Sequence, residues 1–481
     1  MTDIIVDYVD EVYIRVRSEP HVEQEISELF TFEIPSAKFM ARKMPHLKNW
    51  NGKIFLYSIK TKKVYYGLLD KIKNYANENG YNLINNLPQN DVIFSDEFIL
   101  DYMKKLELPH IPRDYQIGGF KDCINSNRRL IVSPTGSGKS LLIYMLTRFY
   151  IEERVLIIVP TTNLVEQMEK DFIDYGYDGD IQKIYSGKSK DVNSNIVIGT
   201  WQTIINMPEG WIDQFGAVLF DEAHTCKAKS LTAILTSLRR CKHRFGFTGT
   251  LQTEEVNILV LEGLFSTYNK VISSSELMDR EELAKLDIDI IVLQYEEEIK
   301  KQMRDCDYQD EISFLIGNVN RNKFIINLIK SITGNTLVLF QRVENHGEIL
   351  YNLLKNKRDN VFYLHGQISG EKRQNIINDI DNCDNAIMIA SYGVLSTGVN
   401  IPNLNNAIFA SPYKSKIKVL QSLGRALRIT KDKKTANLYD IADDLSYKGK
   451  NNYTLNHLLE RVKIYNDEKF KYRIHEYRIN R

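Results

Sequence analysis

The feature that most constrains the fold is a short apolar run followed at once by a glycine-rich loop. The run is Arg129–Val132, and residues 133–140 read Ser-Pro-Thr-Gly-Ser-Gly-Lys-Ser. A strand, loop and helix start of this kind turns backbone N–H groups inward around phosphate groups. The loop begins with Ser133 where the usual signature has Gly or Ala, but Ser is small enough to permit the turn. The sequence therefore predicts a parallel-sheet domain that binds a nucleoside triphosphate.

The side chains of this loop and of a second apolar run predict the chemistry of the site. Lys139 would reach the β and γ phosphates, and Ser140 would ligate Mg²⁺. The run Ala217–Phe220 ends in two acids, of which Asp221 would hold the hydration shell of Mg²⁺ and Glu222 would orient or deprotonate the attacking water. The remaining loop residues expected to bind the nucleotide are Thr135, Gly136, Ser137 and Gly138. We therefore expect ATP and Mg²⁺ as the bound groups.

Length and composition limit the class of protein. A chain of 481 residues is too long for one core and predicts about three domains. The formal net charge of +1 gives no overall signal for a polyanionic partner, so a nucleic-acid surface would need local segregation of charge. The five cysteines lack the paired spacing of a zinc site, and no apolar stretch approaches the roughly 20 residues that span a bilayer. We expect a soluble, intracellular protein without a membrane partner.

Two series of alternating strands and helices predict two α/β domains with parallel sheets. The first series has strands expected at 129–133, 154–159, 195–199, 217–221 and 244–248, and the second has strands expected at 336–340, 361–364, 386–390 and 406–410. The apolar residues of 453–478 recur at helical spacing and predict a helical end to the chain. The predicted organisation is a small α+β domain at 1–90, a first α/β domain at 91–255, a connecting segment at 256–320, a second α/β domain at 321–445 and a helical segment packed on it at 446–481.

A basic and aromatic strip lies in the first of these domains. Its cations are Lys38, Arg42, Lys43, Lys48, Lys53, Lys60, Lys62, Lys63, Lys71 and Lys73, against the single acid Asp70. The interleaved aromatic residues are Phe39, Trp50, Phe55, Tyr57, Tyr65 and Tyr66. Such a strip suits a surface that follows a phosphate backbone and stacks bases, whereas aromatic residues in strands also commonly form a core. The pattern leaves nucleic-acid binding and ordinary solvation both open.

A pair of arginines in the second α/β domain predicts a role in hydrolysis. Arg425 and Arg428 lie three residues apart and share one face if their segment is helical. An arginine delivered to the transferring phosphoryl group neutralises charge that grows in the transition state. We therefore expect both arginines to act on the nucleotide bound by the first domain.

The ordered set of motifs resembles the superfamily 2 helicases, most closely the UvsW-type recombination helicases of T-even phages, over nearly the whole chain. The resemblance implies two tandem RecA-like domains preceded by the small α+β domain. It implies an adenine-recognition segment in which Gln116 reads the base edge while Arg113 and Tyr115 pack nearby. Further residues that the resemblance assigns to the nucleotide are Gly398, Asn400 and Gln421.

The same resemblance assigns nucleic-acid contacts and residues that couple hydrolysis to strand movement. The expected nucleic-acid contacts are Thr161, Thr162, Asn163, Thr200, Trp201, Gln202, Gln341, Arg342 and Thr397. The expected coupling residues are His224, Thr248 and Thr250. The Phe-Thr-Gly-Thr spelling of the motif that holds Thr248 departs from the commonest Ser-Ala-Thr, and His224 lacks the partners of a zinc ligand.

The resemblance implies an ATP-dependent DNA helicase or translocase that acts on branched DNA in phage recombination, repair and replication. Fork regression, Holliday-junction branch migration and unwinding of R-loops are the implied reactions, with branched or double-stranded DNA and RNA–DNA hybrids as partners. We expect a monomer in the cytoplasm, which is that of the bacterial host if a phage encodes the chain. The alternatives are an RNA helicase, a restriction-type motor subunit, or a switch that binds nucleic acid under ATP control without unwinding it.

Overall fold

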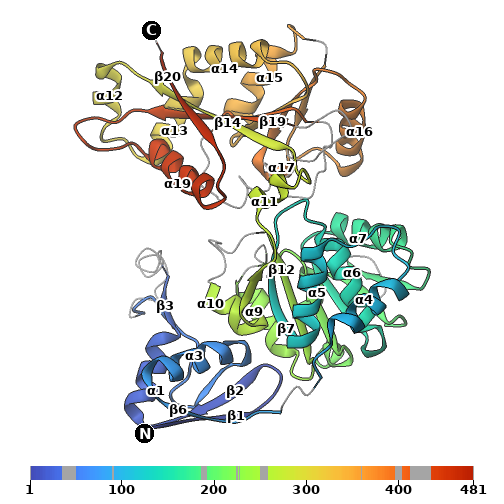
Figure 1. Cartoon of the computed structure of the whole chain (residues 1–481). Helices are drawn as coiled ribbons and strands as arrows, with labels where there is room; N and C mark the ends of the chain where they lie inside the picture. The colour runs from blue at the N-terminus through green and yellow to red at the C-terminus, as the bar shows by residue number, and fades with distance from the viewer. Residues whose placement is uncertain are drawn as a thin grey trace. The chain divides into compact units, whose positions relative to one another are not determined.

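The computed structural model describes residues 2–34, 50–88, 92–185, 192–223, 226, 228–249, 258–358, 360–395, 404–411 and 435–479. The chain forms two compact units (Figure 1). One unit comprises Met1–Ser133 with Gly138–Val271, and the other comprises Pro134–Ser137 with Ile272–Arg481. No helix in these described ranges is long and apolar enough to cross a membrane.

The first unit begins with a four-stranded sheet in the order β5-β2-β1-β6. Its strands are β1 (Asp3–Tyr8), β2 (Tyr13–Arg17), β5 (Lys63–Tyr65) and β6 (Asn82–Asn86), and a small hairpin pairs β3 (Thr31–Glu33) with β4 (Lys53–Phe55). Helices α1 (Pro20–Leu29) and α3 (Leu69–Asn79) cover one face of the sheet (Figure 1). Because side chains alternate along a strand, Ile4, Val6 and Ile14 pack under these helices while their neighbours point to the other face.

A seven-stranded parallel sheet forms the centre of the first unit, in the order β13-β7-β12-β11-β8-β10-β9. Its strands are β7 (Arg128–Val132), β8 (Val155–Val159), β9 (Ile181–Ile184), β10 (Ile196–Thr200), β11 (Ala217–Phe220), β12 (His243–Thr248) and β13 (Tyr268–Lys270). Its helices are α4 (Asp96–Lys105), α5 (Asp114–Ser126), α6 (Lys139–Phe149), α7 (Thr162–Asp174), α8 (Trp201–Ile204), α9 (Ala228–Ser237) and α10 (Ile258–Phe265). The five strands expected in this region are all present, and β9 and β13 extend the sheet at its two edges.

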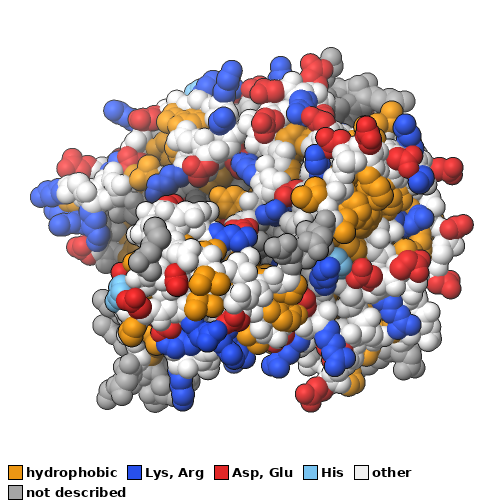
Figure 2. Space-filling model, turned by 60° about the horizontal axis from the view of Figure 1, so that its bottom comes forward, with side chains coloured by type: hydrophobic (Ala, Val, Ile, Leu, Met, Phe, Trp, Pro, Cys, Tyr) orange, Lys and Arg blue, Asp and Glu red, His pale blue; other side chains and the backbone are white. Residues whose placement is uncertain are grey.

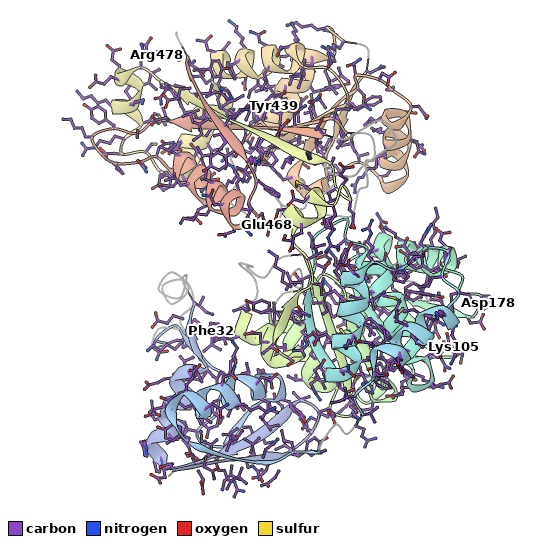
Figure 3. The ribbon with its side chains drawn as sticks, in the orientation of Figure 1. Phe32, Lys105, Asp178, Tyr439, Glu468 and Arg478 are labelled. Carbon is purple, nitrogen blue, oxygen red and sulfur yellow. The ribbon has the colours of Figure 1, made fainter. Side chains whose placement is uncertain are left out.

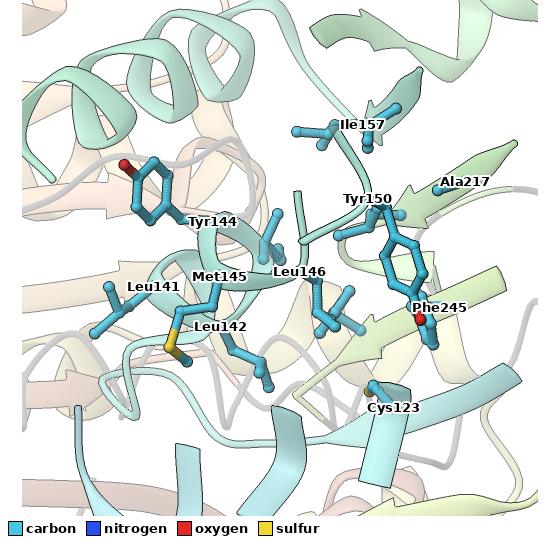
Figure 4. Packing of buried hydrophobic residues seen from close by; sticks show 14 of the residues in the cluster. Cys123, Leu141, Leu142, Tyr144, Met145, Leu146, Tyr150, Ile157, Ala217 and Phe245 are labelled. Atoms are coloured by element: carbon cyan, nitrogen blue, oxygen red, sulfur yellow. The ribbon is translucent and has the colours of Figure 1, made fainter. Parts of the chain in front are cut away.

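Helix α6 is buried against this sheet (Figure 4). Leu142, Met145 and Leu146 pack with Ile157 of β8 and Phe245 of β12 in one apolar cluster. A helix that is apolar almost all round is typical of the interior of a large domain. This burial fixes the helix whose first residue is Lys139.

The second unit holds another seven-stranded parallel sheet, in the order β16-β17-β15-β18-β19-β14-β20. Its strands are β14 (Lys285–Gln294), β15 (Thr336–Phe340), β16 (Val361–Leu364), β17 (Ile387–Ser391), β18 (Asn406–Phe409), β19 (Thr435–Asp444) and β20 (Tyr472–Arg478). Its helices are α11 (Ser274–Asp279), α12 (Glu297–Met303), α13 (Tyr308–Gly317), α14 (Val319–Ser331), α15 (Glu348–Leu354), α16 (Gly370–Asp381), α17 (Tyr392–Leu395) and α19 (Tyr453–Asp467). Two tandem parallel-sheet domains behind a small α/β domain confirm the predicted fold class.

Two local predictions are wrong. Helix α19 ends at Asp467, and Tyr472–Arg478 forms the edge strand β20, where the helical pattern was expected to continue to 478. The expected connecting segment at 256–320 contributes strands to both sheets, β13 to the first and β14 to the second. Strand β13 pairs with β7, and β14 pairs with β20, so each has a partner far away in the sequence. Local periodicity carries no signal of such pairing. Figure 3 marks β19 with Tyr439 and the end of β20 with Arg478.

Two fully buried ion pairs fasten helices to β19. Arg321 of α14 donates to both carboxylate oxygens of Asp443 at 2.8 and 2.9 Å. Arg461 of α19 donates to Asp440 at 2.8 Å, and the Tyr465 hydroxyl donates to the same carboxylate at 2.8 Å. Since side chains alternate along a strand, Asp440 and Asp443 lie on opposite faces of the sheet. Each face therefore holds one helix by a charged, hydrogen-bonded anchor.

The small amino-terminal sheet is tied closely to the first seven-stranded sheet. Arg128, at the start of β7, forms an ion pair with Glu11 and lies 4.3 Å from the centre of the Tyr66 ring. Gly67 approaches α10 so closely that a Cβ atom there would lie 2.2 Å from the Glu262 carbonyl oxygen. Any larger residue at 67 would force these elements apart. The small domain thus packs directly onto the first α/β domain.

Candidate functional site

The glycine-rich loop follows β7 and leads directly into α6, as its sequence predicts. Gly138 caps the helix with φ of 75°, a left-handed conformation that favours glycine. Ser137 donates its hydroxyl to the Pro134 carbonyl at 2.7 Å, which closes the turn. The loop therefore has the backbone form expected of a phosphate cradle.

Lys139 lies between the loop and the two acids at the end of β11. Its Nζ atom donates to the Ser133 carbonyl at 3.1 Å and lies 3.5 Å from a carboxylate oxygen of Glu222. The Lys139 and Glu222 side chains are 12% and 19% exposed, so solvent and substrate reach this pair. Because the charged atoms of the pair are 3.5 Å apart and both side chains are partly exposed, the ammonium group can reach a phosphate.

The carboxyl group of Asp221 lies in an environment that disfavours its negative charge. Its side chain is buried, and burial together with the neighbouring Glu222 carboxylate raises the pKa of Asp221 to about 7. The charge of Lys139 and a hydrogen bond from the Glu222 N–H at 2.9 Å offset this rise in part. A divalent cation would offset it further, and the Asp221 carboxylate and the Ser140 hydroxyl supply oxygen ligands of the kind that Mg²⁺ takes.

The described residues contain no cluster of three or more His, Cys, Asp or Glu side chains that could hold a metal by themselves.

Tyr175 is a neighbour of the site that the sequence analysis did not identify. Its hydroxyl oxygen lies 2.9 Å from the Ser140 Oγ atom, and the residue follows the end of α7. This contact orients the hydroxyl that is the candidate Mg²⁺ ligand. Tyr175 lies 35 residues from Ser140 in the sequence and belongs to no local motif, so only the tertiary structure reveals it.

Gln116, which was predicted to read the adenine edge, contacts the phosphate loop. Its Oε1 atom accepts from the Arg113 N–H at 2.8 Å, and its Nε2 atom donates to the Gly138 carbonyl at 3.2 Å. The residue is only 5% exposed. Arg113 also donates to the Tyr115 hydroxyl at 2.7 Å, so the three residues of this segment contact one another. Both ends of the Gln116 amide are thus engaged within the protein.

Candidate nucleic-acid contacts of the first unit gather at the ends of two adjacent strands. Val159 of β8 is paired with Thr200 of β10, so the loops that follow both strands emerge side by side. Gln202 joins them by donating to the Pro160 carbonyl at 3.1 Å. The Thr161 hydroxyl accepts from the Leu164 N–H and caps α7. The exposed residues Thr162 and Asn163 and the half-buried Trp201 complete this set.

Thr248 connects the end of β12 to the phosphate loop. Its carbonyl accepts from the Ser133 N–H at 2.9 Å, and its side chain is fully buried. The described part of the motif predicted to couple hydrolysis to movement is therefore hydrogen-bonded to the loop that would hold the phosphates.

The described nucleic-acid candidates of the second unit follow β15. The Gln341 N–H donates to the Ser411 hydroxyl at 3.3 Å, and the Gln341 side chain is exposed. The Arg342 guanidinium donates to Gln309 and to the Ser313 hydroxyl of α13. Arg342 is therefore held by α13 in this structure. Its guanidinium group would have to break these two hydrogen bonds to contact a phosphate.

Several predicted site residues lie outside the described residues. They are His224, Thr250, Thr397, Gly398, Asn400, Gln421, Arg425 and Arg428. The same holds for the basic-strip residues Lys38, Phe39, Arg42, Lys43 and Lys48. Their assigned roles stay predictions.

Three family models match successive parts of the chain. Residues 3–86 match the model described as DNA helicase UvsW, N-terminal. Residues 109–253 match the type III restriction enzyme, res subunit, and residues 320–430 match the helicase conserved C-terminal domain. The first of these ranges covers the small sheet domain. The second spans β7 to β12 of the first seven-stranded sheet, and the third spans β15 to β18 of the second.

Relatives and solved structures show the same similarity over the whole chain. The ATP-dependent DNA helicase uvsW of Enterobacteria phage T4 is 33% identical over 98% of this chain and 98% of its own length. The crystal structure of T4 UvsW matches with a TM-score of 0.53 and 32% identity, over 99% of this chain and 100% of that one. S. cerevisiae Dbp5 bound to RNA matches with a TM-score of 0.52 at 15% identity, over 80% of this chain and 94% of that one, and shares the fold alone.

Proposed function

This chain belongs to the UvsW-type DNA helicases of superfamily 2, and we propose that it uses ATP hydrolysis to move and separate strands in branched DNA. The observation that carries the proposal is the position of Lys139 between the phosphate-loop carbonyl of Ser133 and the acid Glu222. A phosphate loop, a cation and a base candidate at one sheet edge are the parts that phosphoryl transfer to water requires.

Within the proposal, each residue of the ATP site has one role. Lys139 neutralises phosphate charge, and Glu222 orients and deprotonates the attacking water. Asp221 and Ser140 would hold Mg²⁺, which supplies charge neutralisation on the phosphate oxygens when bound. Tyr175 keeps the Ser140 hydroxyl in position. Arg425 and Arg428, which lie outside the described residues, are proposed to add positive charge at the transferring group.

Nucleic-acid contacts are proposed at the loops after β8, β10 and β15. Thr161, Thr162 and Asn163 present a helix start, whose N–H groups suit a phosphate. Gln202 ties that loop to the one after β10, so the two loops would grip a backbone together. Phosphate contacts carry little base information, and binding should therefore tolerate many sequences and weaken with salt.

The proposed substrates are forks, Holliday junctions and R-loops. Separating one base-pair step costs about 1.4 kcal/mol in stacking. Repeated hydrolysis coupled to movement can meet this cost at every step. We further propose that the protein acts as a monomer in the cytoplasm of a bacterial host, with DNA and RNA–DNA hybrids as its partners.

The test is strand displacement and branch migration measured side by side. Synthetic DNA forks, four-way junctions, R-loops and RNA duplexes of matched sequence are incubated with the full chain, Mg²⁺ and ATP at low salt. The proposal expects processing of the three DNA-containing branched substrates and little action on the RNA duplex. Preferred unwinding of the RNA duplex would favour an RNA helicase, and ATP-dependent binding without any strand separation would favour a switch.

A further inference from the structure

One face of the amino-terminal sheet is covered by neither α1 nor α3. Among the described residues, both of these helices pack on the other side, over the face that holds Ile4 and Val6. The strand registers place Lys63, Arg15, Asp7 and Asn86 in one row across the opposite face. Arg17, Ile5 and Ile84 form the next row. We call these seven residues the open face.

Asp7, the one acid of the open face, is paired, whereas two cations of this face form no ion pair among the described residues. Arg17 pairs with Asp7 at 2.5 Å, and Asn86 donates to the same carboxylate at 2.9 Å. Arg15 and Lys63 have no carboxylate within ion-pair distance among the residues that the structure describes. Arg15 lies close enough to Asp7 to lower its pKa, and the Lys63 ammonium lies 5.8 Å from the centre of the Tyr13 ring. With Arg17, this face carries three cations against one acid.

A basic turn of the first α/β domain adjoins this face. The turn between α9 and β12 exposes Arg239, Arg240 and Lys242. The Glu11 N–H donates to the Arg239 carbonyl at 3.1 Å, two residues before Tyr13 of β2. Burial raises the pKa of Tyr13, and the nearby charge of Arg239 opposes that rise, which places the turn beside the sheet. Figure 2 brings this side forward and shows Lys and Arg side chains gathered on its lower part.

The predicted basic strip behaves differently. Lys62 pairs with Glu23, Lys71 with Glu262 and Lys73 with Asp70, and the Tyr57 side chain is 1% exposed in the core. Much of the strip is therefore used for internal contacts. Lys63 of the strip lies on the open face, so it adds its charge to Arg15 and to the cations of the basic turn.

We propose that the open face and the basic turn form one binding platform for a single DNA strand. Arg15, Lys63 and the turn cations contact successive phosphates, since exposed cations on a flat sheet follow a flexible backbone. Ile5 and the 37% exposed Ile84 give bases an apolar surface between these cations. A duplex keeps its bases stacked inside and would gain only the phosphate contacts, so the platform fits a single strand best.

This assignment deepens the proposed helicase function by naming a surface that holds one strand outside the motor loops. Because the small domain packs directly on β7 and α10, a strand held here moves with the first α/β domain. The surface therefore suits the retention of a strand at a fork.

The test is fluorescence anisotropy with a labelled oligothymidylate of 30 nucleotides and the full chain without ATP. The variant Arg15→Ala, Lys63→Ala, Arg240→Ala removes three platform cations that lie outside the ATP site. We expect the dissociation constant to rise about 10-fold at 0.1 M salt, and the logarithmic salt slope to shrink by about 2, at roughly 0.7 for each lost phosphate contact. The matched control Lys104→Ala, Lys105→Ala, Lys170→Ala removes three exposed lysines of α4 and α7 and should change neither value.

The remaining arms decide the assignment. Basal ATP hydrolysis and the melting temperature should stay unchanged in the platform variant, which separates lost binding from lost folding. An unchanged salt slope, or an equal loss in the control, would overturn the platform. An equal loss of affinity for a blunt duplex would overturn the assignment to a single strand. A larger loss of affinity in Lys60→Ala would show that DNA binds to strip residues outside the open face. ATP-driven strand separation by the wild type is measured separately, so its absence would count against the helicase function alone.

Discussion

The two seven-stranded sheets use charge pairs for opposite purposes. In the second unit, Arg321 with Asp443 and Arg461 with Asp440 are 0 to 1% exposed and hydrogen-bonded at 2.8 to 2.9 Å. In the first unit, Lys139 and Glu222 form a 3.5 Å pair that is partly open to solvent. Buried pairs with several hydrogen bonds are costly to break, whereas a loose pair at a sheet edge can exchange partners cheaply. Tight pairs here hold the fold, and the loose pair can exchange its contact for one with a substrate phosphate.

The largest expected effect is on the stability of the second unit. Arg461→Leu leaves the Asp440 carboxylate buried without its cation, which should cost about 3 to 5 kcal/mol. Differential scanning calorimetry of the variant should show the melting temperature of the second unit lowered by about 10 °C. The double variant Arg461→Leu, Asp440→Leu removes both charges and should recover most of this loss. Equal melting of the single variant and the wild type would contradict the structural role of the pair.

The corresponding change in the first unit should affect chemistry instead of stability. Lys139→Ala removes the ammonium from the phosphate loop and should lower kcat for ATP hydrolysis by about 10²- to 10³-fold. The melting temperature should change little, because the pair is long and partly exposed. Lys139→Arg keeps the charge but not its position and serves as the control. A variant that loses stability but retains turnover would reverse the comparison between the two sheets.

Gln116→Ala should have a smaller effect. It removes one hydrogen bond to the Gly138 carbonyl and one to the Arg113 N–H, so the KM for ATP should rise about 10-fold. If Gln116 acts through the phosphate loop, as its contacts indicate, the KM for GTP should rise equally. Steady-state kinetics with both nucleotides decide this, and a rise confined to ATP would restore the base-reading role predicted from the sequence.

The smallest effect is expected at the edge strand β20. Asp289 of β14 accepts from Arg473 and His475 at 2.8 Å. Although burial raises its pKa, these hydrogen bonds outweigh that effect, and the net pKa of Asp289 is lowered. A lowered folded-state pKa stabilises the fold above the unfolded value of about 3.9, and that stability is lost as the pH falls through the folded-state pKa.

Since Arg473 is 64% exposed, Asp289→Asn should cost under about 1 kcal/mol at pH 7. Thermal melting of the variant and the wild type should differ slightly at pH 7 and converge in acid below about pH 4. A difference that grows on acidification would contradict the assigned direction.

The sequence predicted the parts of the molecule that local patterns determine. The apolar runs before the phosphate loop and before Asp221 are strands of one sheet, and Lys139 and Glu222, which follow these strands, lie 3.5 Å apart. Strand β20 was missed because it pairs with β14, which lies far away in the sequence. Arg473 of β20 and its partner Asp289 of β14 are 184 residues apart. Tyr175 and the Gly138 contact of Gln116 were missed for the same reason, since a tertiary contact leaves no local periodicity.

The central claim is that the Lys139 and Glu222 centre powers strand separation. The most direct measurement is displacement of a labelled strand from a synthetic DNA fork by the wild type and by Glu222→Gln, with Mg²⁺ and ATP. The account predicts that the wild type releases the strand, whereas Glu222→Gln binds the fork with similar affinity and releases none. Strand release by Glu222→Gln at the wild-type rate would contradict it.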